Sequence, residues 1–162
     1  MTKLRTNAKH RIVVGVDGSD GARLALRWAA EEAVRRNGQL ELVHTWHITY
    51  AGEFLVPNSG DLQQSGREVL DAASDEAREF GADVTASDLV SGGAAQALLD
   101  KAKGADLLVV GSRGRGGFGA LLLGSTSQQC VHHAPCPVVV PASWRSTNQR
   151  TDPNHPTDHP TP

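Results

Sequence analysis

The sequence predicts an α/β fold: a five-stranded parallel sheet with helices on both faces. Two observations lead to this prediction. Short β-branched runs alternate with longer segments of helical period, and glycines stand at many of the boundaries between them. Strands that alternate with helices pair in parallel through right-handed crossovers, which places helices on both faces of the sheet. The length of 162 residues suits one domain.

The first part of the chain predicts a strand, a helix and a second strand. Arg11–Val16 is a compact β-branched run, typical of a buried strand. A helix then begins at Ser19 or Asp20 and ends at about Arg36, because small and apolar residues recur at helical spacing until Gly38. Leu40–Trp46 is the second strand. Residues 47–60 show no period and contain several turn-forming residues, so a loop is expected there.

The rest of the chain continues the alternation as far as a polar tail. The expected elements are a helix over Asp61–Phe80, a strand over Asp83–Val90, a helix over Ala94–Lys103, a strand over Ala105–Val110, a loop over Gly111–Gly119, a helix over Ala120–His133 and a strand over Pro137–Pro141. We therefore expect a short extension over 1–9, one domain over 10–142 and a Pro- and His-containing tail over 143–162. That tail is predicted to be disordered because it cannot bury apolar surface.

Composition and charge exclude several classes of protein. Sixteen Lys and Arg residues nearly balance eighteen Asp and Glu residues, which gives a net charge of −2, and aromatic residues make up 4%. A nucleic-acid partner is not expected, because the chain offers neither a strongly basic surface nor many stacking rings. No apolar run is long enough for a membrane span or a secretory signal. Two cysteines without an export signal indicate reduced thiols in the cytoplasm.

The glycine-rich loop is the first candidate site. Five glycines lie among the nine residues of Gly111–Gly119, and Gly124, Ser125 and Thr126 follow. Backbone N–H groups of such a loop can surround a phosphate, hydroxyls can donate to it, and Arg113 and Arg115 can balance its charge. The alternative is a surface loop whose glycines only permit tight turns. No Walker A motif is present, and the G-x-G-x-x-G from Gly114 lacks the acidic residue of a dinucleotide site.

Three further candidates are weaker. Asp17 ends the first strand, where its carboxylate can accept a hydrogen bond from an adenine amino group or a ribose hydroxyl, but the sequence alone favours a helix-capping role together with Ser19. The Cys130–Cys136 segment lacks the second ligand cluster that a structural zinc site needs. No G-x-S-x-G motif occurs and Ser125 has no evident base, so no catalytic or metal-binding residues are predicted.

Together, these residues resemble one known family. The spacing Gly111-x2-Gly114-x9-Gly124-Ser125 resembles the G-x2-G-x9-G-[ST] nucleotide motif of the ATP-binding universal stress proteins. Val13–Ser19 is similar to that family's first strand, and Ala134–Val140 is similar to its last. The resemblance covers roughly residues 9 to 141 and a single copy of the domain.

The resemblance implies a sheet of order 3-2-1-4-5, as in the Rossmann-like adenine nucleotide α-hydrolase group, with ATP across the ends of strands one and four. Asp17 and the backbone near Gly15 would meet the adenosine, and Thr45 would lie near adenine, where an apolar residue is frequent. Val110 and Gly111 would flank the ribose. The implied phosphate-binding residues are Arg113, Gly114, Gly124, Ser125 and Thr126, with Ser112, Gly116 and Gly117 alongside.

The resemblance also implies a role and partners. A homodimer through the strand at 138–140 is expected, and a divalent ion, Mg²⁺ or Mn²⁺, would accompany the triphosphate. The implied role is a cytoplasmic, ATP-dependent regulator of stress or dormancy with at most slow hydrolysis. Two alternatives stay open: a nucleotide-free interaction module, and an ATP-using hydrolase or ligase of the wider fold group.

Overall fold

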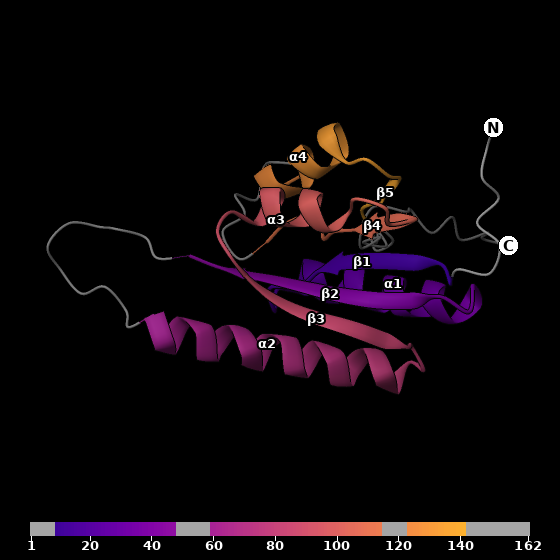
Figure 1. The fold of residues 1–162 in the computed structure, drawn as a ribbon, viewed down its shortest axis with the longest axis horizontal. Coiled ribbons are helices and arrows are strands. Elements are labelled where there is room, and N and C mark those ends of the chain that lie inside the picture. Colours follow the sequence, from indigo (N-terminus) through magenta and orange to yellow (C-terminus); the bar gives the residue numbers. More distant parts are fainter. Residues whose placement is uncertain (1–8, 48–58, 115–122, 142–162) are drawn as a thin grey trace, which may run out of the picture.

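The computed structural model describes residues 9–47, 59–114 and 123–141, and they form one parallel sheet in the order β3-β2-β1-β4-β5 (Figure 1). This confirms the predicted fold class and strand order. The elements in chain order are β1 (Arg11–Gly15), α1 (Asp20–Arg35), β2 (Gln39–Trp46), α2 (Ser59–Glu79), β3 (Val84–Ser91), α3 (Ala94–Lys101), β4 (Leu107–Val109), α4 (Ser125–His133) and β5 (Val138–Val139).

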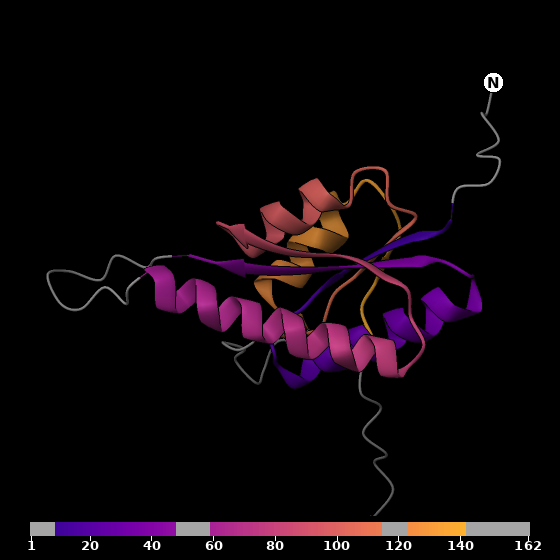
Figure 2. The same cartoon turned by 60° about the horizontal axis from the view of Figure 1, so that its bottom comes forward.

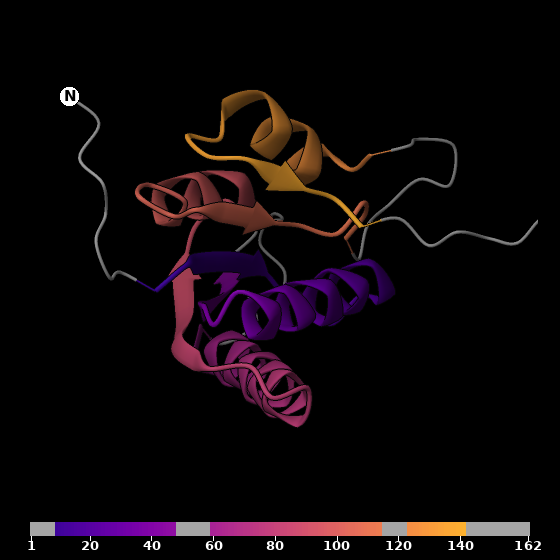
Figure 3. The ribbon, with the colours of Figure 1, turned by 90° about the vertical axis from the view of Figure 1, so that its right-hand side faces the viewer.

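The sheet lies between two pairs of helices. Helices α1 and α2 cover one face, and α3 and α4 cover the other (Figures 2 and 3). Side chains alternate between the faces along a strand, so Ile12 and Val14 of β1 belong to the core under α1 and α2, while Val13 belongs to the core under α3 and α4. All three are fully buried. Burial on both faces explains why the strand is apolar from Ile12 to Val14.

Several element boundaries differ from the predicted ones. Helix α2 begins at Ser59, two residues earlier than the expected Asp61, so the end of the predicted loop is helical. Helix α4 begins at Ser125 and not at Ala120, because Gly124 has extended backbone and its N–H donates to Ser112 O. Strands β4 and β5 are shorter than predicted, since only two residue pairs join them.

Charged side chains tie the elements together at the amino ends of the strands. The Arg11 guanidinium donates to both Glu41 oxygens, at 2.6 and 2.7 Å, to the carbonyl of Lys101 at the end of α3, and to the carbonyl of Lys103 in the turn that follows. The hydrogen bond with Glu41 raises the pKa of Arg11 above its usual value. One side chain thus connects β1, β2 and the last turn of α3.

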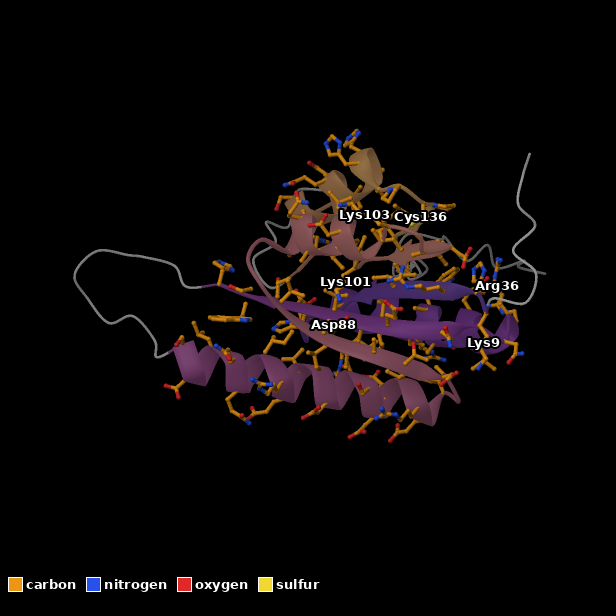
Figure 4. All side chains as sticks on the ribbon, in the orientation of Figure 1. Lys9, Arg36, Asp88, Lys101, Lys103 and Cys136 are labelled. Atoms are coloured by element: carbon orange, nitrogen blue, oxygen red, sulfur yellow. The ribbon has the colours of Figure 1, made fainter. Side chains whose placement is uncertain are left out.

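Further ion pairs support the same region. Lys9 Nζ lies 2.8 Å from Asp83, and Lys101 Nζ lies 2.8 Å from Asp88 of β3. Figure 4 shows Lys101 and Asp88 next to each other, with Lys9 beyond them toward the start of β1. These pairs are partly exposed, so each contributes little alone. The Lys9–Asp83 pair lies at the start of β3, and the Lys101–Asp88 pair joins the end of α3 to the middle of β3.

Some predictions fall outside the described residues. The tail over 143–162 and residues 1–8 of the extension are among them, so the division into extension, domain and tail stays a prediction. Within the parts of the chain that the structure describes, no helix has both the length and the apolar character needed to cross a membrane.

Candidate functional site

A cavity of about 350 Å³ lies at the carboxyl ends of β1, β2 and β4. The chain leaves β1 for α1 on one face of the sheet and leaves β4 for α4 on the other, so the cavity sits where the direction of the strand order changes. Ligands of open α/β sheets bind at this position. The lining residues are Gly15, Val16, Asp17, Ala22, Val43, His44, Thr45, Ala94, Leu98, Val110, Gly111, Arg113, Gly114, Gly124, Ser125, Thr126 and Ser127.

Asp17 supports the cap of α1 and also lines the cavity, while its contact with adenine or ribose stays a prediction. Its Oδ1 accepts from the Ser19 N–H at 2.9 Å and from the Ser19 hydroxyl at 2.5 Å. The Ser19 Oγ in turn accepts from the Ala22 N–H at 3.2 Å and caps α1. Ser19 is therefore the capping residue, and Asp17 orients it while also lining the cavity.

Glycines let the loop after β4 lie directly on the start of α1. A Cβ at Gly111 would be 2.6 Å from Gly21 C and 2.9 Å from Ala22 N, and a Cβ at Gly21 would be 2.5 Å from Arg113 O. These are backbone atoms, which cannot move aside as a flexible side chain can. Gly111 and Gly21 are thus required for the close approach of the two segments, and this approach forms one wall of the cavity.

A second set of contacts closes the loop onto α4. The Gly124 N–H donates to Ser112 O at 2.7 Å, and the buried Ser127 hydroxyl donates to Gly111 O at 2.6 Å. Ser112 itself does not line the cavity, so it acts through its backbone carbonyl. These bonds hold the residues before and after the glycine-rich segment next to each other, although 115–122 lie outside the described residues.

The amino end of α4 faces the cavity. Its cap residue, Gly124, supplies no side-chain hydrogen bond, and no acidic residue lies in the first turn of this helix. Ser125 and Thr126 line the cavity there, and Arg113 is the one Lys or Arg among the described lining residues. Helix amino ends carry partial positive charge and N–H donors. This end of the cavity is therefore suited to an anion such as phosphate.

His44 fixes the other end of the cavity. Its Nδ1 lies 2.6 Å from Val16 O, and because a carbonyl can only accept, Nδ1 carries a proton. The Val16 N–H donates to Val43 O at 2.9 Å, so both backbone polar groups of Val16 are bonded to β2. The backbone that leads into Asp17 is thereby held in place.

The structure brings together most of the residues that the sequence analysis selected. Ten of the thirteen line the cavity, namely Gly15, Asp17, Thr45, Val110, Gly111, Arg113, Gly114, Gly124, Ser125 and Thr126. Ser112 does not line it, and Gly116 and Gly117 are outside the described residues. His44 of β2 also lines the cavity.

The sequence analysis missed the apolar contribution of α3. Leu98 lines the cavity from α3, and a Cβ at Gly15 would be 3.1 Å from Leu98 Cδ1, so Gly15 makes room for that side chain. Ala94, at the start of the same helix, also lines the cavity. The order of elements could have indicated this contribution. In a parallel sheet, the helix after β3 begins at the carboxyl ends of the strands, where the cavity lies.

The cysteine–histidine segment shows no metal site. Within 9–47, 59–114 and 123–141, no group of three or more His, Cys, Asp or Glu side chains could hold a metal ion. Cys130 of α4 is fully buried, and this burial raises the pKa of its thiol to about 11. Cys136 is only partly buried, and both cysteines are free.

The chain is similar to known proteins over almost all of the described region. Residues 9–141 match the model of the universal stress protein family. The universal stress protein Rv2623 of Mycobacterium tuberculosis is 36% identical over 142 residues, which is 83% of this chain and 48% of the relative. A Thermus aquaticus universal stress protein is 37% identical over 80% of this chain and 96% of the relative. The chain spans about half the length of the mycobacterial relatives.

Two solved structures share the fold and hold adenine nucleotides. A universal stress protein in complex with cAMP aligns with a TM-score of 0.62 and 28% identity, over 83% of this chain and 97% of the other. The universal stress protein from Archaeoglobus fulgidus in complex with dAMP aligns with a TM-score of 0.63 and 27% identity, over 83% and 98% of the two chains.

Proposed function

The chain belongs to the universal stress protein family, and from this premise we propose that its cavity binds ATP and that the protein acts as a nucleotide-dependent regulator of a stress or dormancy response. The observation that supports this most is that a single cavity has two ends that are lined by different groups. Thr45 lies at the β2 side, and the loop after β4 and the amino end of α4 lie at the other, while Asp17 follows β1, the strand between β2 and β4, with its Oδ2 2.8 Å from where a Cβ of Gly114 would lie.

The two ends suit the two parts of the ligand. Asp17 Oδ2 can accept from a ribose hydroxyl or from the adenine amino group, since the hydrogen bonds to Ser19 use Oδ1. Val43, Leu98 and Val110 supply apolar surface for the base or sugar. Arg113, Ser125 and Thr126 supply positive charge and hydroxyl donors for phosphates.

Adenine nucleotides bound by two structural relatives support the class of ligand, while the choice of ATP over a monophosphate is our proposal. The glycine and serine spacing supports it, because the loop and α4 offer more donors than one phosphate requires. Asp17 is the single carboxylate among the described lining residues, so phosphate oxygens would supply most ligands of any Mg²⁺ or Mn²⁺.

We propose a binding protein and not an efficient enzyme. Among the described lining residues, no hydrogen bond joins Ser125 or Ser127 to a histidine or carboxylate that would act as a base, and the Ser127 hydroxyl donates to Gly111 O instead. ATP hydrolysis, if measured, is expected to be slow. An ATP-using hydrolase or ligase is the alternative, and it predicts turnover that depends on a second substrate.

We also propose a cytoplasmic homodimer formed through β5. Val138 and Val139 are partly exposed, and β5 pairs with β4 on one side only, which leaves the other edge of the strand for a second copy. The mycobacterial relatives are about twice as long as the matched region. A dimer would give this chain a comparable size.

The test is to identify the nucleotide that the native protein carries. The purified protein is denatured, the released nucleotides are separated by chromatography, and the stripped protein is titrated with ATP, ADP and AMP by calorimetry. The proposal expects ATP to be released or to bind most tightly. A protein that releases none and binds none would be the nucleotide-free interaction module that the sequence left as an alternative.

A further inference from the structure

A second cavity lies between α1 and α2, outside the candidate nucleotide site. Its volume is about 400 Å³, within the usual range for small-molecule sites. The lining residues are Val16, Gly18, Ala22, Arg23, Leu26, Ser65, Glu68, Val69, Ala72, Ala73 and Glu76. Val16 and Ala22 line both cavities, so the two spaces meet the same segment of the chain after β1.

Small residues on both helices produce this cavity. Helices α1 and α2 lie side by side on one face of the sheet (Figures 2 and 3). Ala22 of α1 and Ala72 and Ala73 of α2 are too short to fill the space between the helices, while Leu26 and Val69 supply apolar walls. Leu26 is fully buried and Val69 is partly buried. An occupant would therefore need an apolar body.

The cavity is lined by more negatively charged than positively charged residues. Two carboxylates, Glu68 and Glu76, and one guanidinium, Arg23, line it. Arg23 Nε lies 3.9 Å from Glu76 Oε2, so these two charges offset each other. Glu68 accepts from the neutral Gln64 amide at 3.1 Å, which leaves its negative charge uncompensated by that contact. An occupant with a positive charge complements this set.

We propose that the cavity between α1 and α2 binds a small organic cation, an amine with an apolar body. The apolar body would lie against Leu26 and Val69, and the ammonium group would lie at Glu68, with the Ser65 hydroxyl as an acceptor. This site does not depend on the nucleotide proposal, because Glu68 and Ala72 do not line the first cavity.

Three probes with one apolar body test the charge requirement. 4-Phenylbutylamine, 4-phenylbutan-1-ol and 4-phenylbutyrate are titrated into the full chain near neutral pH, and binding is followed by NMR. The proposal expects the amine to bind roughly fivefold more tightly than the alcohol, and the carboxylate to bind most weakly. Equal affinities of the three probes, or no binding of the amine in the millimolar range, would overturn it.

Two variants locate the site. Glu68→Gln should weaken amine binding about three- to fivefold, whereas Asp71→Asn, which makes the same charge change at an exposed position of α2 outside the cavity, should not. Ala72→Leu, at an exposed position, should fill the cavity and abolish binding while circular dichroism and the thermal midpoint stay unchanged. Equal effects of Glu68→Gln and Asp71→Asn, or unchanged amine binding by Ala72→Leu, would contradict the proposal.

Discussion

The two ends of the sheet are built by different means. At the amino ends of the strands, charged side chains connect neighbouring elements, with Arg11 bonded to Glu41 and to carbonyls at and just after the end of α3. At the carboxyl ends, backbone lies against backbone through Gly21 and Gly111, and a cavity remains open. The contacts at the amino ends hold neighbouring elements together. The arrangement at the carboxyl ends leaves polar backbone groups and hydroxyls available for a ligand.

This difference separates the residues that stabilise the fold from those that bind. An additional negative charge at the carboxyl ends of the strands would repel an anionic ligand, whereas the amino ends of α3 and α4 attract one. The α4 first turn has no acidic residue, while the first turns of α1 and α2 contain Asp20 and Asp61. Substitutions at the amino ends should therefore change the free energy of unfolding, whereas substitutions at the carboxyl ends should change the affinity for a ligand.

The largest effect is expected where the two roles overlap. Gly111→Ala should lower the free energy of unfolding by about 3 kcal/mol and abolish nucleotide binding, because its Cβ would overlap backbone atoms of Gly21 and Ala22. Urea denaturation and calorimetry measure the two quantities. Gly93→Ala is the control, since no atom lies within 4 Å of a Cβ at that position. A fully stable Gly111→Ala variant would show that the described approach of the loop to α1 is wrong.

A smaller effect is expected at the opposite end of the sheet. Arg11→Met should lower the free energy of unfolding by about 2 kcal/mol, because Glu41 loses its partner while partly buried and two carbonyls at and just after the end of α3 lose a donor. The affinity for nucleotide should not change. Lys9→Met removes an exposed pair with Asp83 and should change the stability by less than about 0.5 kcal/mol. Equal losses in the two variants would contradict this account of the Arg11 contacts.

The smallest effect is a pH dependence from Cys130. The folded state holds the thiol proton because burial raises the pKa of Cys130 from about 9 to about 11. The contribution to stability is therefore complete below pH 9 and is lost as the pH rises toward 11, by about 1 kcal/mol between pH 9 and 10. Denaturation at several pH values, compared with Cys130→Ala, measures the difference. If both proteins show the same slope, the thiol ionises alike in the folded and unfolded states.

The sequence predicted the fold and most of the candidate site because both depend on local patterns. Alternating apolar runs define β1 and β2, and the glycine spacing from Gly111 to Gly124 marks the loop. The sequence analysis predicted the start of α4 too early, at Ala120, because a glycine-rich stretch gives no helical period that would mark where the helix begins. It begins at Ser125 since the bond from Gly124 to Ser112 holds the preceding backbone extended.

Other features depend on contacts between distant parts of the chain. Arg11 bonds to residues 30 and more than 90 positions away, and no local pattern indicates these partners. The same holds for the approach of Gly21 to Arg113 and for Leu98 in the cavity wall. Packing between elements determines these positions, and a single sequence shows only which residues are available for it.

The most direct measurement compares ATP and AMP binding in the original chain, in Gly124→Ala and in Gly93→Ala. A methyl group at Gly124 would contact the backbone of Arg113 at 3.6 Å and lie 3.9 Å from Gly114 N, so it would cover, without a clash, an N–H that we propose donates to a phosphate. We expect Gly124→Ala to weaken ATP about tenfold or more and AMP much less, with Gly93→Ala unchanged. Equal binding of ATP by all three proteins would contradict the placement of the phosphates at the amino end of α4.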